Sequence, residues 1–272
     1  MSVLDEILIA KRAEVARLRA DAAAIEAEAA AAPRSDRDFA AALRRPDGRL
    51  AVVAEIKRRS PSKGPLAPDL DAAATAARYA AGGAAALSVL TDGPYFDGSL
   101  ADLRAARGAA GLPVLRKDFT VDPIQLHEAR AAGADAVLLI VAALPDDALL
   151  ADLAALAAEL GLAALVEAED EAGVERALAA GANIVGVTNR NLRDFGEDLS
   201  TGARLAGLIP PGVVAVAESA IRSVDDARAM ADAGFSAVLV GEHLVRSSDP
   251  EAAVAALAAV PRSTTEVDRC AT

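Results

Sequence analysis

Residues 129–141 read ARAAGADAVLLIV, which is an alanine-rich helical end, one glycine and then a continuous apolar run. Glycine is common just past a helix C-terminus, where the backbone adopts a left-handed conformation. The same punctuation recurs as Ala-Ala-Gly-Ala before Asn183 and as Ala-Asp-Ala-Gly-Phe before Ser236. The repeat predicts a chain in which each helix leads directly into a buried strand.

Outward from this stretch, short apolar runs alternate with longer amphipathic stretches from residue 49 onward. Strands that are apolar on both faces and separated by helices indicate a parallel sheet covered by helices. The predicted strands are Leu50–Ile56, Ala84–Leu90, Pro113–Arg116, Ala136–Val141, Ala163–Val166, Ile184–Val187, Val213–Ala217 and Ala237–Val240. Eight units fit a doubly wound sheet or a closed barrel, and the lack of further strands favours the barrel. The predicted class is α/β, a single (β/α)8 TIM barrel with an N-terminal helical extension.

The extension is expected to comprise residues 1–48, packed on a barrel that spans residues 49–261. Leu4, Ile7 and Leu8 give its first helix an apolar stripe, which favours packing over a flexible leader. Pro33 is expected to end the helical run, and Phe39 to begin another short helix. A polar tail, residues 262–272, is predicted to be loose.

Composition excludes several classes of protein. The formal net charge of −12 argues against binding to nucleic acid, which needs a basic surface. Charges interrupt the N-terminal twenty residues, and no apolar run approaches a membrane span, so neither a signal peptide nor a membrane partner is predicted. The single cysteine, Cys270, cannot form a disulfide within the chain, and a reducing cytoplasm is therefore expected.

Charged and polar side chains follow most of the predicted strands. In a parallel barrel these positions meet at one rim, where active sites are built. Any one charge could be a salt bridge that closes the barrel mouth, but lysine and glutamate are rarely buried unpaired. So many converging charges therefore indicate an active site with proton donors and acceptors. They include Glu55, Lys57, Lys117, Asp118, Glu167, Thr188, Arg190, Glu218, Ser219 and Glu242.

Two features of the rim predict an anionic ligand. Ser219-Ala220 and Gly241 each precede a predicted helix whose N–H groups would face an anion, although an ordinary helix cap is the plainer interpretation. Residues 57–64, KRRSPSKG, carry four cationic side chains, which suit an anionic substrate. The alternative interpretation is a solvated, flexible loop. His127 and His243 are the only histidines, and cysteines are not clustered, so no metal site is predicted.

Several of these motifs resemble those of the indole-3-glycerol-phosphate synthase family. Residues 55–64, EIKRRSPSKG, resemble its first-strand signature, and residues 113–119, PVLRKDF, resemble its third. The segments SVLT at 88–91, YFDGS at 95–99, LVE at 165–167, NRNL at 189–192 and ES at 218–219 follow in family order. The likeness spans nearly the whole chain, including the N-terminal extension.

The resemblance implies a carboxy-lyase of tryptophan biosynthesis that needs no metal or organic cofactor. Its substrate would be 1-(2-carboxyphenylamino)-1-deoxyribulose 5-phosphate, closed to indole-3-glycerol phosphate with loss of CO2 and water. By this resemblance Lys117 is the general acid, Glu167 the base or cation stabiliser, and Lys57 the partner of the substrate carboxylate, with Glu55 orienting the lysines. Substrate-binding positions would be Phe96, Phe119 and Leu192 for the aromatic ring, Thr188 and Arg190 at the rim, and Ser60, Ser219, Ala220, Gly241 and Glu242 for the phosphate.

Two positions depart from the family pattern. Thr188 stands where the family usually has asparagine, and Ala220 where it has glycine. A methyl group at 220 could crowd the phosphate or oppose a positive φ. We expect both residues to lower activity, so that restoring asparagine and glycine would raise catalytic efficiency.

Two other functions stay open from the sequence. One is another phosphate-binding barrel enzyme, such as a sugar-phosphate isomerase, which lacks the first- and third-strand motifs. The other is a degenerate, low-activity barrel that binds a phosphorylated ligand, against which the retained acid and base residues speak. The expected partner is a small sugar phosphate, and the expected assembly is a monomer or a weak homo-oligomer.

Overall fold

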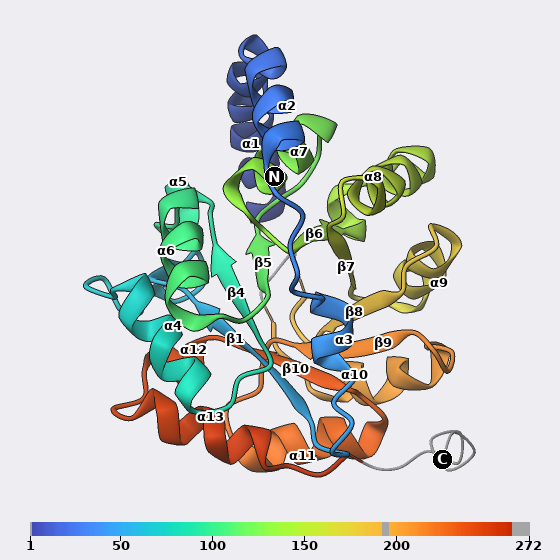
Figure 1. Ribbon diagram of the computed structural model, residues 1–272. Coiled ribbons are helices and arrows are strands. Elements are labelled where there is room, and N and C mark those ends of the chain that lie inside the picture. The colour runs from blue at the N-terminus through green and yellow to red at the C-terminus, as the bar shows by residue number, and fades with distance from the viewer. Residues whose placement is uncertain (1, 192–195, 263–272) are drawn as a thin grey trace.

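The computed structural model describes residues 2–191 and 196–262, and its strands close into a barrel (Figure 1). The parallel strands are hydrogen-bonded in the order β1-β10-β9-β8-β7-β6-β5-β4, which confirms the predicted (β/α)8 fold. Each strand of the barrel overlaps a predicted one. The strands are β1 (Ala51–Ile56), β4 (Ala86–Leu90), β5 (Val114–Lys117), β6 (Ala136–Ile140), β7 (Ala163–Ala168), β8 (Ile184–Thr188), β9 (Val214–Glu218) and β10 (Ala237–Val240).

The two-residue period of the strands decides which side chains reach the barrel mouth. Val53, Leu115, Leu165 and Val216 all point into the barrel interior, where they pack with one another. The residue two positions further along a strand faces the same side. Those residues are Glu55, Lys117, Glu167 and Glu218, and they therefore lie one layer higher, at the C-terminal end of the barrel.

Helices cover the outside of the barrel, and most begin at an Asp or Ser whose side chain accepts a hydrogen bond from a backbone N–H of the first turn. They are α4 (Ala72–Ala81), α6 (Leu100–Ala110), α7 (Pro123–Ala132), α8 (Asp147–Glu159), α9 (Glu171–Ala179), α10 (Ser200–Leu205), α11 (Val224–Ala233) and α13 (Pro250–Ala258). Shorter elements are β2 (Arg59–Ser60), β3 (Gly64–Pro65), α5 (Gly93–Phe96), α12 (Glu242–Val245) and the 3-10 turns η1 (Val141–Ala143) and η2 (Ala206–Leu208).

The N-terminal segment contains three helices, α1 (Val3–Ala20), α2 (Ala22–Ala31) and α3 (Phe39–Leu43). The expectation of one helical run up to Pro33 is wrong, because Asp21 leaves helical geometry at φ −111° and ψ 19° and separates α1 from α2. Figure 1 shows α1 and α2 beside α7. Phe39 and Leu43 of α3 are buried with the barrel-interior residues.

The extension thus contacts both ends of the barrel. Beside α3, Arg44 donates to the carbonyl of Gly212 and Arg45 to that of Gly83, and both glycines precede strands. The division at residues 48 and 49 stays a prediction, and the predicted tail lies outside the described residues beyond Arg262. No described helix is long and apolar enough to cross a membrane.

Candidate active site

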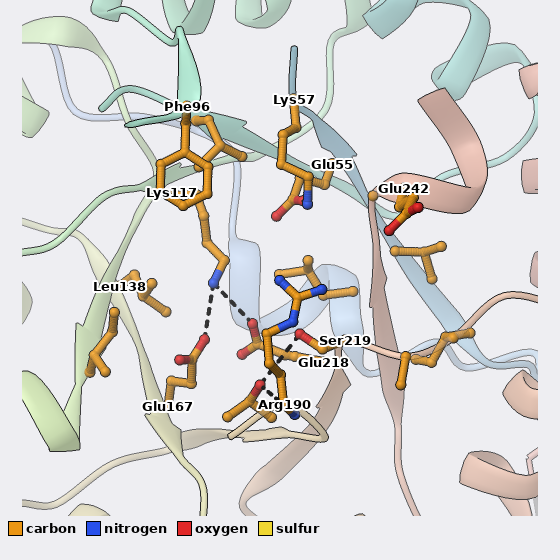
Figure 2. A pocket seen from close by; sticks show the side chains of 18 of the residues that line it. Glu55, Lys57, Phe96, Lys117, Leu138, Glu167, Arg190, Glu218, Ser219 and Glu242 are labelled. Carbon is orange, nitrogen blue, oxygen red and sulfur yellow. Dashed lines mark hydrogen bonds and ion pairs between the residues drawn. The ribbon is translucent and has the colours of Figure 1, made fainter. Parts of the chain in front are cut away.

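A pocket opens at the C-terminal ends of the strands, where the sequence predicts the site (Figure 2). Residues from all eight barrel strands or the segments that follow them, together with α1, line it. They are Leu4, Ile7, Glu55, Lys57, Leu90, Phe96, Lys117, Asp118, Phe119, Leu138, Ile140, Glu167, Thr188, Arg190, Glu197, Glu218, Ser219, Ala220, Ile221, Arg222, Leu239, Val240, Gly241 and Glu242.

Lys117 lies at the centre of this pocket, with its ammonium between two glutamates (Figure 2). Its Nζ lies 3.0 Å from Glu167 Oε2 and 3.2 Å from Glu218 Oε2. Burial by itself would lower the pKa of Lys117, but the charges of Glu167, Glu218 and Glu55 raise it above its usual value. Lys117 is therefore a protonated donor at neutral pH, held at a defined place.

Glu218 lies against the same ammonium and is almost fully buried. Burial raises the pKa of its carboxyl, and the negative charge of Glu167 raises it further, while Lys117 acts in the opposite direction. A like charge nearby disfavours ionisation of a buried carboxyl. Glu218 therefore retains its proton to higher pH than an ordinary glutamate does, and this proton lies beside the Lys117 ammonium.

Glu55 and Lys57 form a second ion pair on β1 and the residue after it. Burial would raise the pKa of Glu55, but the charges of Lys57 and Lys117 lower it below its usual value, so Glu55 is ionised. Gly241 leaves room for this pair, since a side chain on that residue would overlap Glu55 Oε1 and come within 3.0 Å of Lys57 Nζ. The Lys57 side chain stays 12% exposed, which allows it to face a ligand.

An apolar wall forms one side of the pocket. The rings of Phe96 and Phe119 are 6.1 Å apart at an angle of 39°. Leu138 and Ile140 of β6, and Leu4 and Ile7 of α1, complete the wall. Such a surface suits an aromatic ring laid next to the ammonium of Lys117.

The opposite side of the pocket carries the loops after β9 and β10. Ser219 and Ala220 both have positive φ, 65° and 61°. The expectation that they directly precede a helix is wrong, because α11 begins at Val224 with Ser223 as its cap. Gly241 does precede a helix and is the N-cap residue of α12. The two loops offer backbone N–H groups and the Ser219 hydroxyl to an anion.

An arginine pair bounds this side of the mouth. Glu197 forms ion pairs with both Arg190 and Arg222. Burial would raise the pKa of Glu197, but the two guanidinium groups hold it below the usual range. Arg190 is thus oriented at the rim, while Arg222 stays largely exposed.

Ala220 pays a conformational penalty for its left-handed backbone, since an alanine there costs about 1–2 kcal/mol. We expect Ala220→Gly to raise the free energy of unfolding by about 1 kcal/mol, measured by urea denaturation. The matched control is Ala252→Gly on an exposed turn of α13, which should lower stability by about 1 kcal/mol. A loss of stability in both variants would contradict the strain at Ala220.

The sequence matches one family of known proteins over most of its length. The model of the indole-3-glycerol phosphate synthase family matches residues 4–257. The chain belongs to this family. An indole-3-glycerol phosphate synthase of Rhodococcus jostii (strain RHA1) is 53% identical over 94% of this chain and 95% of its own length. One of Streptomyces griseus is also 53% identical, over 95% of this chain and 96% of its own length.

Solved structures with low sequence identity share the fold. Thiamine phosphate pyrophosphorylase from Pyrococcus furiosus aligns with a TM-score of 0.57 at 18% identity, over 77% of this chain and 94% of its own. A mandelate oxidase variant aligns with the same TM-score at 19% identity, over 78% of this chain and 71% of its own.

Most positions assigned from the indole-3-glycerol phosphate synthase resemblance meet in this one pocket. Ser60 does not line it, because it lies in the β2–β3 hairpin, where its hydroxyl accepts from the N–H of Lys63 at 3.3 Å. Leu192 lies outside the described residues. The Thr188 hydroxyl lies 3.4 Å from that of Ser219 and accepts from the N–H of Arg190.

Three residues that line the pocket were given no role in the site from the sequence. Glu218 was noted at the rim without a role, although its place two residues after Val216 could have marked it as inward-facing. Glu197 and the α1 residue Ile7 come from segments outside the strand ends.

Among the described residues no group of three or more His, Cys, Asp or Glu side chains is placed to hold a metal ion.

Proposed function

We propose that this member of the family is an indole-3-glycerol-phosphate synthase. It takes 1-(2-carboxyphenylamino)-1-deoxyribulose 5-phosphate, joins the ring carbon that bears the carboxylate to the sugar carbonyl carbon, and releases CO2 and then water. The observation that carries the proposal is the position of Lys117, between two glutamates, with an apolar wall on one side and the loops after β9 and β10 on the other.

Lys117 is the general acid of this proposal. As the new carbon–carbon bond forms, its ammonium donates to the carbonyl oxygen, which becomes a hydroxyl. The raised pKa keeps the proton available at neutral pH. The same hydroxyl later departs as water after a second proton transfer, and proton transfer of this kind contributes about 10²–10⁴ to a rate.

The glutamates restore the proton balance. Glu167 stabilises the cationic charge on the anilino nitrogen that develops during attack, and takes the proton lost on dehydration. Glu218 lies against Lys117 and, because its pKa is raised, can carry a proton between the two steps. Glu167 can return to Lys117 the proton that it takes from the substrate, and one further proton per turnover comes from solvent, because loss of CO2 from a carboxylate consumes a proton.

The remaining contacts orient the substrate. The Lys57 ammonium pairs with the substrate carboxylate until it leaves as CO2, and Glu55 holds Lys57 in place. Phe96 and Phe119 accept the aromatic ring. The phosphate is bound by Ser219 and by the backbone at Ala220, Gly241 and Glu242, with Arg190 at the rim. Holding both ends places the ring carbon near the carbonyl before any bond forms.

The same proposal covers the binding partner, the cellular compartment and the assembly of the enzyme. The partner is a small sugar phosphate rather than nucleic acid or a membrane, in keeping with the net charge of −12. We also propose a cytoplasmic enzyme that is a monomer or a weak homo-oligomer, with an N-terminal extension packed on its catalytic barrel.

The test is a steady-state assay of the wild-type enzyme with the carboxyphenylamino-deoxyribulose phosphate, followed by the fluorescence of the indole product. We expect turnover of this substrate and none of simple aldose or ketose phosphates. Interconversion of those phosphates would instead support a sugar-phosphate isomerase. Binding of the substrate without turnover in well-folded protein would support the degenerate barrel.

A further inference from the structure

Lys11 is a buried lysine that belongs to no part of the mechanism described above. It lies on α1, and its side chain is 1% exposed. Its Nζ lies 2.8 Å from Asp118 Oδ1, 3.1 Å from Asp92 Oδ2 and 2.9 Å from Glu14 Oε2. A lysine is almost never buried so completely without partners, and here the three carboxylates surround it.

Two of these carboxylates hold the loops that carry the apolar wall. Asp118 stands between Lys117 and Phe119, and its Oδ1 also accepts from the N–H of Phe119 at 2.8 Å. Asp92 accepts from the N–H of Tyr95 at 2.9 Å and so caps α5, whose last residue is Phe96. One ammonium from the extension therefore bridges the segment after β4 and the segment after β5.

We propose that Lys11 is a positioning residue, which fixes Phe96 and Phe119 relative to each other and to Lys117 so that the substrate's aromatic ring can be bound. This inference rests on the proposed function, since it assigns the aromatic slot to the carboxyphenylamino ring. Lys11 itself does not line the pocket, and it acts through Asp92 and Asp118.

The two carboxylates depend on Lys11 to different degrees. Asp118 also pairs with Arg116 at 3.2 Å and accepts from the Thr91 hydroxyl at 2.6 Å. Asp92 is 2% exposed, and Lys11 is its one ion-pair partner in the part of the chain that the structure describes. Removal of one member of a buried ion pair leaves the other charge uncompensated. Loss of Lys11 is therefore expected to displace Asp92 more than Asp118. The displacement of Asp92 would carry α5 and its last residue, Phe96, with it.

The titration of the cluster agrees with this geometry. Burial would lower the pKa of Lys11, but the charges of Asp118 and Asp92 and hydrogen bonds to Asp118 and Glu14 raise it above its usual value. Burial would raise the pKa of Asp118, but Arg116 and Lys11 lower it to about 2. Lys11 and Asp118 are thus both charged throughout the neutral range, and their ion pair does not depend on pH there.

The experiment compares Lys11→Met with the wild-type enzyme in the steady-state assay, well below the melting temperature of both. We expect KM for the carboxyphenylamino-deoxyribulose phosphate to rise tenfold or more, and kcat to fall by a smaller factor. A merely structural role would lower the folded fraction, and so kcat, while KM stayed constant. A KM within twofold of the wild-type value would overturn the proposal.

Two further variants distinguish a positioning role of Lys11 from a role in packing α1 against the barrel. Val15→Ala removes buried packing from the same helix without touching the ion pairs, and should lower the melting temperature with KM unchanged. Adding Asp92→Asn to Lys11→Met removes the uncompensated charge, while the amide of the new side chain can still cap α5. The double variant should have a kcat/KM at least threefold higher than that of Lys11→Met alone. A KM increase in Val15→Ala equal to that of Lys11→Met, or no recovery in the double variant, would refute the assignment. An inactive wild-type enzyme would instead refute the proposed function.

Discussion

Lys117→Ala is expected to lower kcat by about 10³-fold or more, because a positioned general acid contributes about 10²–10⁴ to the rate. The ammonium also neutralises two buried glutamates, at 3.0 and 3.2 Å, so its loss changes the charge of the whole pocket. KM should change much less, since the aromatic wall and the phosphate loops remain. The measurement is kcat from the fluorescence assay, with circular dichroism to show that the variant is folded.

Arg228→Ala serves as the matched control for the loss of a cation. Arg228 is exposed on α11 and pairs with Asp225, away from the pocket. Its removal should leave kcat within twofold of the wild-type value, because exposed ion pairs contribute little. If folded Lys117→Ala retained more than a tenth of the wild-type kcat, another group would have to be the acid.

Much of the barrel was predictable because the sequence repeats one local rule. Most helices of the barrel end at a glycine or close to one, and an apolar run follows, as at residues 129–141. The rim residues were predictable for the same reason, since parallel strands present their C-terminal ends together. Glu55, Lys57, Lys117 and Glu167 therefore meet where the strand pattern places them.

Other features depend on contacts between distant segments. Lys11 has the pattern of a solvated charge on an amphipathic helix, and only the approach of Asp92 and Asp118 from two loops makes it a buried one. Arg190 and Glu197 form an ion pair that no periodicity of the sequence predicts. The positive φ of Ser219 was likewise not expected, because that conformation is unusual for a residue other than glycine.

Gly186 shows how a residue without a side chain contributes to the site. It lies in the middle of β8, beside Glu167 on β7. A Cβ atom on Gly186 would overlap Glu218 Oε1 and approach Leu165 Cδ1 to 3.2 Å. Glu218 is buried at 2% exposure and lines the pocket, so its carboxylate would have to shift within the pocket, away from its present place beside Lys117, to make room. The absence of a side chain at 186 is therefore what admits the Glu218 carboxylate next to Lys117.

Gly186→Ala is accordingly expected to displace Glu218 and to lower kcat about 10²-fold, the loss that follows a misplacement of about 1 Å in a reacting group. Overpacking should also lower the free energy of unfolding by about 1–3 kcal/mol. Both are measured on the same preparation, kcat in the fluorescence assay and stability by urea denaturation.

The matched control is Gly108→Ala on the exposed side of α6, where an added Cβ meets nothing within 4 Å. Alanine has the higher helix propensity, so this variant should gain up to about 1 kcal/mol and keep its kcat. A kcat for Gly186→Ala within threefold of wild type would show that Lys117 works without Glu218 at this position. The two substitutions add the same methyl group, but only the one at residue 186 contacts Glu218. If kcat falls in Gly186→Ala and not in Gly108→Ala, the position of the Glu218 carboxylate therefore sets the rate.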